Sequence, residues 1–131
     1  MNRPGEVIWD EEIAERQLMN SKAWDLLVEK GYVPGQKTQL DFVFVAGERA
    51  DAVKLKALLE KETDYKVKVI NNDDEYEIAG QTNEMPLSLE GLNVWVSWLV
   101  EQGRKCECSF DGWVAPQIVI SRETMKAELS F

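Results

Sequence analysis

The sequence predicts an α+β fold in which two helices cover one face of a four-stranded antiparallel sheet. Three segments alternate apolar and polar residues at period two, a fourth is apolar on both faces as in a central strand, and three others repeat apolar residues at helical spacing. The 131 residues are 44% apolar, which is enough for one self-supporting core. We therefore expect a single domain over 1–131, made of an N-terminal helix in 8–33, a core in 37–113 and a C-terminal extension in 114–131.

Residues 10–30 are predicted to form a helix that precedes the sheet. Asp10 is a suitable N-cap, and Lys30 with Gly31 is a stop signal. Because some of its apolar residues lie off the main stripe, we expect this helix at an edge or on the open face of the sheet. The main stripe consists of Ile13, Ala14, Trp24, Leu27 and Val28.

The first strand of the sheet is predicted over residues 38–46, and a helix is predicted over 48–62. Leu40, Phe42 and Phe44 share one face of the strand. The opposite face is also largely apolar, which indicates a central strand. The inward side of the helix is predicted to hold Ala52, Leu55, Leu58 and Leu59.

A β-hairpin is predicted next, with its loop centred on Asn72-Asp73. In this register Lys68 lies opposite Glu77, and the apolar and charged faces of the two strands both match. Cross-strand charge pairing then accounts for Glu75 and Glu77 without any catalytic role. The segment from Gly80 to Pro86 is expected to be a loop.

A second sheet helix is predicted over 88–102, with Gly103 as its end. The last strand, over 104–110, alternates so that Cys106, Cys108 and Phe110 share one face. Asp111-Gly112 predicts a turn at its end, because Asp bonds its own backbone and Gly accepts positive φ. Trp113 then folds back as a buried ring, so we expect Asp111, Gly112 and Trp113 to be structural.

The order β-α-β-β-α-β gives the ferredoxin-like sandwich when both crossovers are right-handed. In this topology the strands lie in the order fourth, first, third, second. The core is predicted to comprise Leu40, Phe42, Phe44, Leu55, Leu59, Val67, Val69, Tyr76, Ile78, Leu92, Trp95, Leu99, Cys106, Cys108 and Phe110.

The net charge of −9 is concentrated in residues 72–103, which contain seven acids and no base. Such a field repels nucleic-acid phosphates and attracts basic proteins. We expect a basic protein partner and no direct nucleic-acid binding; the alternative is that the acids only keep the protein soluble. Trp98 and Val94 suggest an apolar patch on the acidic helix, unless the N-terminal helix or the tail covers them. The residues expected to contact the partner are Asp73, Asp74, Glu75, Glu77, Glu84, Glu90 and Trp98.

Catalysis is not expected. The chain has no histidine, the commonest general base, and no glycine-rich phosphate loop. Cys106 and Cys108 lack a second Cys or His pair for zinc, so we expect reduced thiols, no metal and no cofactor. Without an apolar run of about 20 residues or a signal-peptide pattern, a cytoplasmic protein with no membrane contact is predicted.

The aromatic-Asp-Gly-Trp end of the last strand, Phe110 to Trp113, resembles the signature of the regulator of ribonuclease activity B family, bacterial protein inhibitors of the endoribonuclease E machinery. The similarity extends from Glu11 to Trp113. The resemblance implies a ferredoxin-like fold and a non-enzymatic protein that binds and inhibits or modulates a ribonuclease E-like enzyme. The alternative, from another class, is an immunity or antitoxin-like protein that neutralises a basic toxin.

Overall fold

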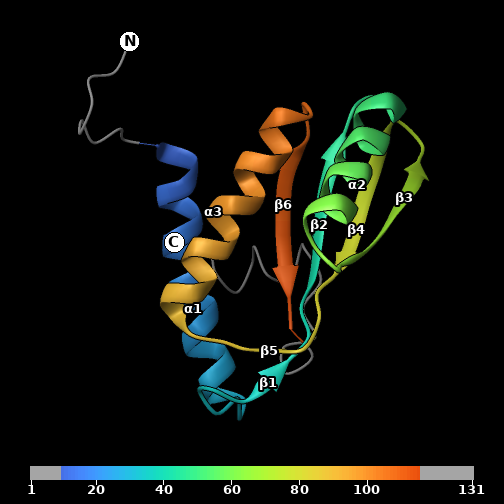
Figure 1. Cartoon of the computed structure of the whole chain (residues 1–131). Helices are drawn as coiled ribbons and strands as arrows, with labels where there is room; N and C mark the ends of the chain where they lie inside the picture. The colour runs from blue at the N-terminus through green and yellow to red at the C-terminus, as the bar shows by residue number, and fades with distance from the viewer. Residues whose placement is uncertain (1–9, 116–131) are drawn as a thin grey trace, which may run out of the picture.

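The computed structural model describes residues 10–115 (Figure 1), so residues 116–131 of the extension predicted over 114–131 lie outside the described residues. The fold is α+β, as predicted, with a four-stranded antiparallel sheet. The observed strand order is also the predicted one. It runs β3 (Lys66–Asn72), β4 (Glu75–Gln81), β2 (Asp41–Ala46) and β6 (Ser109–Val114).

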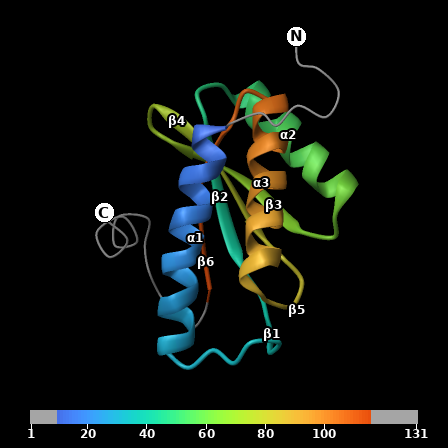
Figure 2. The same cartoon turned by 90° about the vertical axis from the view of Figure 1, so that its left-hand side faces the viewer.

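Within residues 10–115, three helices accompany the sheet: α1 (Glu11–Glu29), α2 (Arg49–Glu62) and α3 (Leu89–Lys105). Helices α2 and α3 lie on one face of the sheet, and α1 packs antiparallel to α3 and covers the β6 edge (Figures 1 and 2). The edge position was one of the two predicted for α1. Asp10 caps this helix, as expected, by accepting a 3.1 Å hydrogen bond from the Ile13 N–H.

The core lies between the sheet and the helices. Most residues of the predicted core are buried, and Val69, Tyr76 and Trp95 are partly buried at its margin. At this margin the Trp95 indole Nε1 donates to the Tyr65 hydroxyl at 3.1 Å. Phe44 lies at the centre, with edge-to-face contacts to Phe42 and Phe110.

The segment predicted as one strand over 38–46 is divided in two. β1 (Lys37–Thr38) pairs with β5 (Met85–Pro86) in a small second sheet, so the predicted 80–86 loop is also partly strand. The chain changes sheet at Leu40, whose backbone N–H donates to the hydroxyl of buried Thr82 at 3.0 Å and whose carbonyl accepts from the Thr82 N–H at 2.9 Å.

The packed side of α1 differs from the predicted apolar stripe. Its buried residues are Asn20, Ala23 and Leu27, whereas Val28 is 43% exposed. Ile13, Trp24 and Leu27 of the predicted stripe do pack against the core, but a stripe chosen by hydrophobicity alone did not include the buried amide of Asn20. The partners of that amide are distant in the sequence and are described below.

The predicted hairpin register was wrong by two residues. The turn consists of Asp73 and Asp74, and Asp73 adopts a positive φ of 53°, which Asp tolerates better than most residues. Lys68 therefore lies opposite Ala79, and Glu77 lies opposite Ile70. The predicted Lys68–Glu77 pair is not formed, although a shift of two keeps every side chain on its predicted face.

Gly103 does not end α3, which continues to Lys105. Gly103 is buried, and a β-carbon there would lie 2.7 Å from the Cys108 carbonyl oxygen and 2.8 Å from the Phe44 ring. The glycine is required for this close approach and not as a stop signal.

The last strand begins at Ser109, not at 104. Cys106 caps α3, and Glu107 adopts a positive φ of 57° in a tight turn. Cys106 and Cys108 are buried and free, so the predicted burial was correct although the backbone is not a strand. The i, i+2 pattern arises here from a turn that returns both thiols to the core.

The predicted turn at Asp111-Gly112 was also wrong, because both residues lie inside β6. Val43 pairs with Gly112 and Phe44 pairs with Phe110, which leaves Asp111 as the extra residue of a β-bulge. Gly112 has a φ of 155°, a conformation rare for residues with a side chain. Trp113 is buried, as expected, with 5% of its surface exposed.

Candidate functional site

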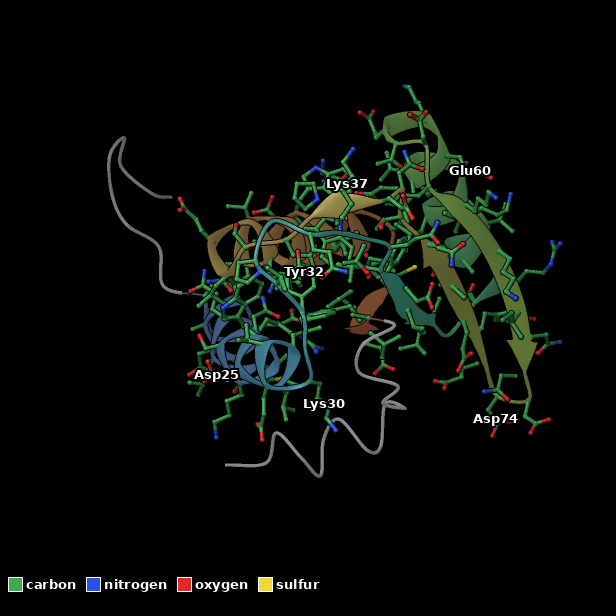
Figure 3. All side chains as sticks on the ribbon, turned by 90° about the horizontal axis from the view of Figure 1, so that it is seen from below. Asp25, Lys30, Tyr32, Lys37, Glu60 and Asp74 are labelled. Atoms are coloured by element: carbon green, nitrogen blue, oxygen red, sulfur yellow. The ribbon has the colours of Figure 1, made fainter. Side chains whose placement is uncertain are left out.

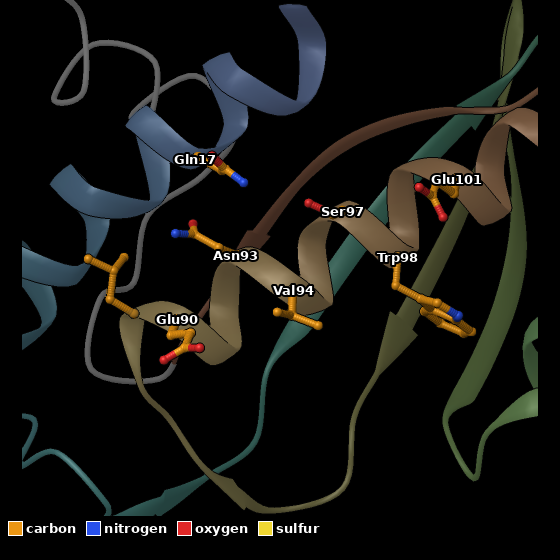
Figure 4. A pocket seen from close by; sticks show the side chains of 8 residues that line it. Gln17, Glu90, Asn93, Val94, Ser97, Trp98 and Glu101 are labelled. Carbon is orange, nitrogen blue, oxygen red and sulfur yellow. The ribbon is translucent and has the colours of Figure 1, made fainter. Parts of the chain in front are cut away.

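The outer side of α3 exposes an apolar side chain between acids. Val94 is 67% exposed, more than any other large aliphatic residue in the described part of the chain. Glu90, Trp98 and Glu101 lie on the same side of the helix (Figure 4). At 100° per residue these four positions fall within an arc of about 80°, so they form one continuous stripe. We call this stripe, Glu90, Val94, Trp98 and Glu101, the α3 ridge.

A shallow groove runs along each side of the α3 ridge. The first, of about 730 Å³, lies towards α1 and the second, of about 640 Å³, lies towards the end of α2. Glu90, Val94 and Trp98 line both. The other lining residues are Gln17, Leu89, Asn93, Ser97 and Glu101 in the first groove, and Thr63, Tyr65, Ser88, Gly91 and Trp95 in the second.

The inner side of α3 holds the ridge in place. Leu92, Val96 and Leu99 are buried against the core, and Ser88 caps the helix by accepting a 3.0 Å hydrogen bond from the Gly91 N–H. This amphipathic pattern leaves the backbone of α3 little freedom, so the ridge side chains project from a fixed support.

A line of buried polar groups joins α3 to α1 and β6. The Trp113 indole Nε1 donates to the Asn20 side-chain oxygen at 2.9 Å, and the Asn20 amide nitrogen donates to the Asn93 side-chain oxygen at 3.0 Å. Asn20 is 2% exposed; its bond to Trp113 is buried, and its bond to Asn93 is partly buried. We call Trp113, Asn20 and Asn93 the polar seam.

Arg16 fixes α1 to the start of the bulge in β6. Its guanidinium donates to the Phe110 carbonyl at 2.6 Å and to the Asp111 carbonyl at 3.4 Å. The same group lies over the Phe110 ring, 5.1 Å from the centroid, which adds a cation–π contact. The segment Phe110 to Trp113 of β6 is therefore the surface against which α1 packs.

An ion-pair cluster joins the N-terminal end of α1 to the C-terminal end of α3. Arg104 of α3 contacts Asp10 at 2.7 Å and Glu12 at 2.8 Å. The hydrogen bond from Arg104, helped by the Ile13 N–H, lowers the pKa of Asp10 to about 2. The same carboxylates raise the pKa of Arg104.

A comparison of the sequence with known protein families identifies the family of this chain. The family model described as Regulator of ribonuclease activity B matches residues 17–114, well over half of the chain. The chain belongs to this family. The match ends at Val114, the last residue of β6, and includes the polar seam, the bulge and the α3 ridge. No curated protein matches the chain at a significant level.

In this member of the regulator of ribonuclease activity B family, the acids of residues 72–103 do not form one surface. Asp73 and Asp74 lie at the tip of the β3–β4 hairpin, on the side of the molecule away from α1 (Figure 3). Glu75 and Glu77 lie on β4, and Glu84 lies in the loop before β5.

Of the residues predicted to contact a partner, the structure brings Glu90 and Trp98 together, and Val94 joins them. The residues that sequence reasoning missed are those from other elements, such as Gln17 of α1 and Tyr65 before β3. The i, i+4, i+8 spacing of Glu90, Val94 and Trp98 was the available signal for the ridge.

The described cysteines are poor nucleophiles. Burial raises the pKa of Cys106 and raises that of Cys108 to about 11, so both thiols stay protonated at neutral pH. Within residues 10–115, no group of three or more His, Cys, Asp or Glu side chains is arranged to hold a metal ion. In the same range, every helix is too short or too polar to cross a membrane.

Proposed function

We propose that the protein regulates a ribonuclease by binding it through the α3 ridge, without acting on RNA itself. The family match supports a ribonuclease as the regulated enzyme. The observation that supports the surface is Val94, a 67% exposed valine on a helix whose other side is fully packed. An apolar anchor surrounded by charge is typical of protein interfaces.

A ribonuclease E-like enzyme with a basic surface fits this site best. The chain has a net charge of −9, and no Lys or Arg lines either groove beside the α3 ridge. Enzymes that bind RNA carry positive surfaces, so an acidic regulator complements them. A binding role without catalysis also agrees with the absence of histidine from the sequence.

The remaining predicted acids have a different role in this proposal. Asp73, Asp74, Glu75, Glu77 and Glu84 lie away from the grooves and do not touch the docked enzyme. Their charge attracts the basic partner over a distance of about 10 Å at 0.1 M salt. They therefore act on the rate of association, while the α3 ridge holds the complex together.

A cleavage assay with a ribonuclease E-like enzyme and a labelled RNA tests the proposal. Wild-type protein should change the cleavage rate, with saturation as the two proteins reach equal concentration. Val94→Asp should weaken the effect about tenfold or more, which corresponds to about 1.4 kcal/mol. Val53→Asp is the matched control, because Val53 is also an exposed helical valine, on α2, with 42% exposure.

Two results would contradict the proposal. Equal losses in Val94→Asp and Val53→Asp would remove the α3 ridge as the contact surface. No effect of wild-type protein on the ribonuclease, together with neutralisation of a basic toxin, would replace regulation with an immunity function. Circular dichroism of each variant should match wild type, because both valines are exposed.

A further inference from the structure

The α3 ridge has a defined pattern of charge as well as an apolar centre. Glu90 lies at one end and Glu101 at the other, with Val94 and Trp98 between them. No Lys or Arg side chain lines either adjoining groove, so neither acid has a cationic neighbour among the lining residues. This surface complements a ligand that is apolar in its middle and cationic at both ends.

The spacing of the acids limits the shape of that ligand. Positions 90 and 101 are about three helical turns apart, or roughly 16 Å along the axis. A second helix beside α3 has the same rise per residue. Its cationic residues would therefore lie about 11 positions apart, with apolar residues at helical spacing between them.

A helix suits the site better than an extended segment. The backbone of α3 is hydrogen-bonded within the helix, so it offers no ladder to which a strand could be added. The first groove lies between the antiparallel pair α1 and α3, to which Gln17 and Asn93 contribute from either side (Figure 4). Such a groove between two helices accepts the side-chain row of a third.

We propose that the α3 ridge binds a basic amphipathic helix of the partner. Apolar residues of that helix contact Val94 and Trp98, and its Lys or Arg residues pair with Glu90 and Glu101. This inference rests on the proposed function, because it specifies which kind of segment of the ribonuclease docks on the ridge.

A synthetic peptide tests the proposal directly. The probe is a fluorescent helical peptide of about 18 residues, with a leucine stripe at i, i+4 and i+7 between two arginines about 11 positions apart. Anisotropy titration with the full chain should show saturable binding. A peptide with the stripe scrambled, and one with Glu in place of both arginines, should each bind at least about tenfold more weakly.

Charge exchange provides the specific control. The double variant Glu90→Lys with Glu101→Lys should lose the arginine peptide and gain the glutamate peptide. The matched control is Asp25→Lys with Glu29→Lys, which changes the net charge equally at two exposed acids of α1 that line neither groove. This control should bind the arginine peptide within about twofold of wild type.

The outcomes separate this proposal from the proposed function. Equal binding of the scrambled peptide, or equal losses in the two double variants, would show unspecific attraction and overturn the basic-helix proposal. If the ribonuclease responds to the protein through Val94 but no peptide binds, only this proposal fails. If the peptide binds and the ribonuclease is unaffected, the basic-helix proposal holds and the proposed function fails.

Discussion

Asn93 and Val94 are consecutive residues of α3, yet the polar one is turned towards α1 and the apolar one towards solvent. Asn93 accepts a hydrogen bond from buried Asn20, whereas Val94 is 67% exposed. At these two positions the usual distribution of polar and apolar groups is reversed, although the inner side of α3 is apolar and buried. The polar seam is paired within the molecule, which indicates a structural role, while the α3 ridge has an apolar surface still to be covered. The predictions below test this division.

The largest effect is expected at the Trp113 end of the polar seam. Trp113→Ala removes a buried ring and the donor to Asn20, and should lower the free energy of unfolding by about 3–5 kcal/mol. Trp113→Phe keeps most of the ring and loses the hydrogen bond, so about 1–3 kcal/mol is expected. Urea denaturation of the three proteins measures both. An unchanged urea midpoint for Trp113→Ala would contradict the structural role of Trp113 and indicate a role in partner binding instead.

A smaller loss is expected at the centre of the seam. Asn20→Ala leaves the Trp113 N–H and the Asn93 oxygen without their partner, at a cost of about 1–3 kcal/mol. Gln17→Ala is the control, since Gln17 is an exposed amide one turn earlier on α1. The free energy of unfolding of Gln17→Ala, measured in urea, should stay within about 0.5 kcal/mol of wild type. Similar losses of stability in the two variants would mean that the hydrogen bonds of the polar seam contribute no stability beyond the effect of the substitution on helix propensity.

Kinetics should separate the α3 ridge from the hairpin acids. Asp74→Lys with Glu75→Lys, at two acids of the β3–β4 hairpin, should slow association with the ribonuclease several-fold at low salt and leave dissociation unchanged. This effect should fade near 1 M salt, where charges are screened beyond about 3 Å. Val94→Asp should instead speed dissociation. Surface plasmon resonance at two salt concentrations measures both rates, and a salt-independent association rate would leave the hairpin acids as solubilising groups only.

The smallest effect is expected at the ion-pair cluster that joins the α1 and α3 ends. The pKa of Asp10 is about 2 in the folded protein, below its ordinary value of 3.8. The unfolded chain therefore takes up this proton first, so the stabilisation is complete above pH 4 and is lost as the pH falls through 2. Asp10→Asn keeps an N-cap without the charge. The melting-temperature difference from wild type should vanish near pH 2, and a constant difference would exclude the ionised carboxylate as its cause.

Much of the fold was predictable from the sequence because it depends on local periodicity. The burial of Phe42, Phe44 and Phe110 follows from alternation, and the strand order follows from β-α-β-β-α-β. The hairpin register was not predictable in the same way, because a slip of two residues preserves both faces. Gly103 was misjudged because a stop signal and a close-packing glycine look alike in sequence.

The site was less predictable, because its residues come from separate elements. Glu90 and Trp98 share one helix, so their spacing placed them on the same side. Gln17 and Tyr65 reach the grooves from other parts of the chain, and no periodicity connects them to α3. Arg16 was missed for the same reason, since its partner Phe110 is 94 positions away. Charge density along the sequence does not indicate that the acids of residues 72–103 lie on separate elements, which only the structure shows.

The position of α1 has a consequence for how this protein behaves at high concentration. β6 is an edge strand, and exposed edges are templates on which strands of other molecules can assemble. Arg16 occupies the Phe110 carbonyl on this strand, and the bulge at Asp111 interrupts its regular ladder. The opposite edge, β3, presents Lys66 and Lys68, which repel an approaching copy of themselves. The two edges of the sheet are thus protected against aggregation in different ways: β6 by the packed helix α1, and β3 by its lysine side chains.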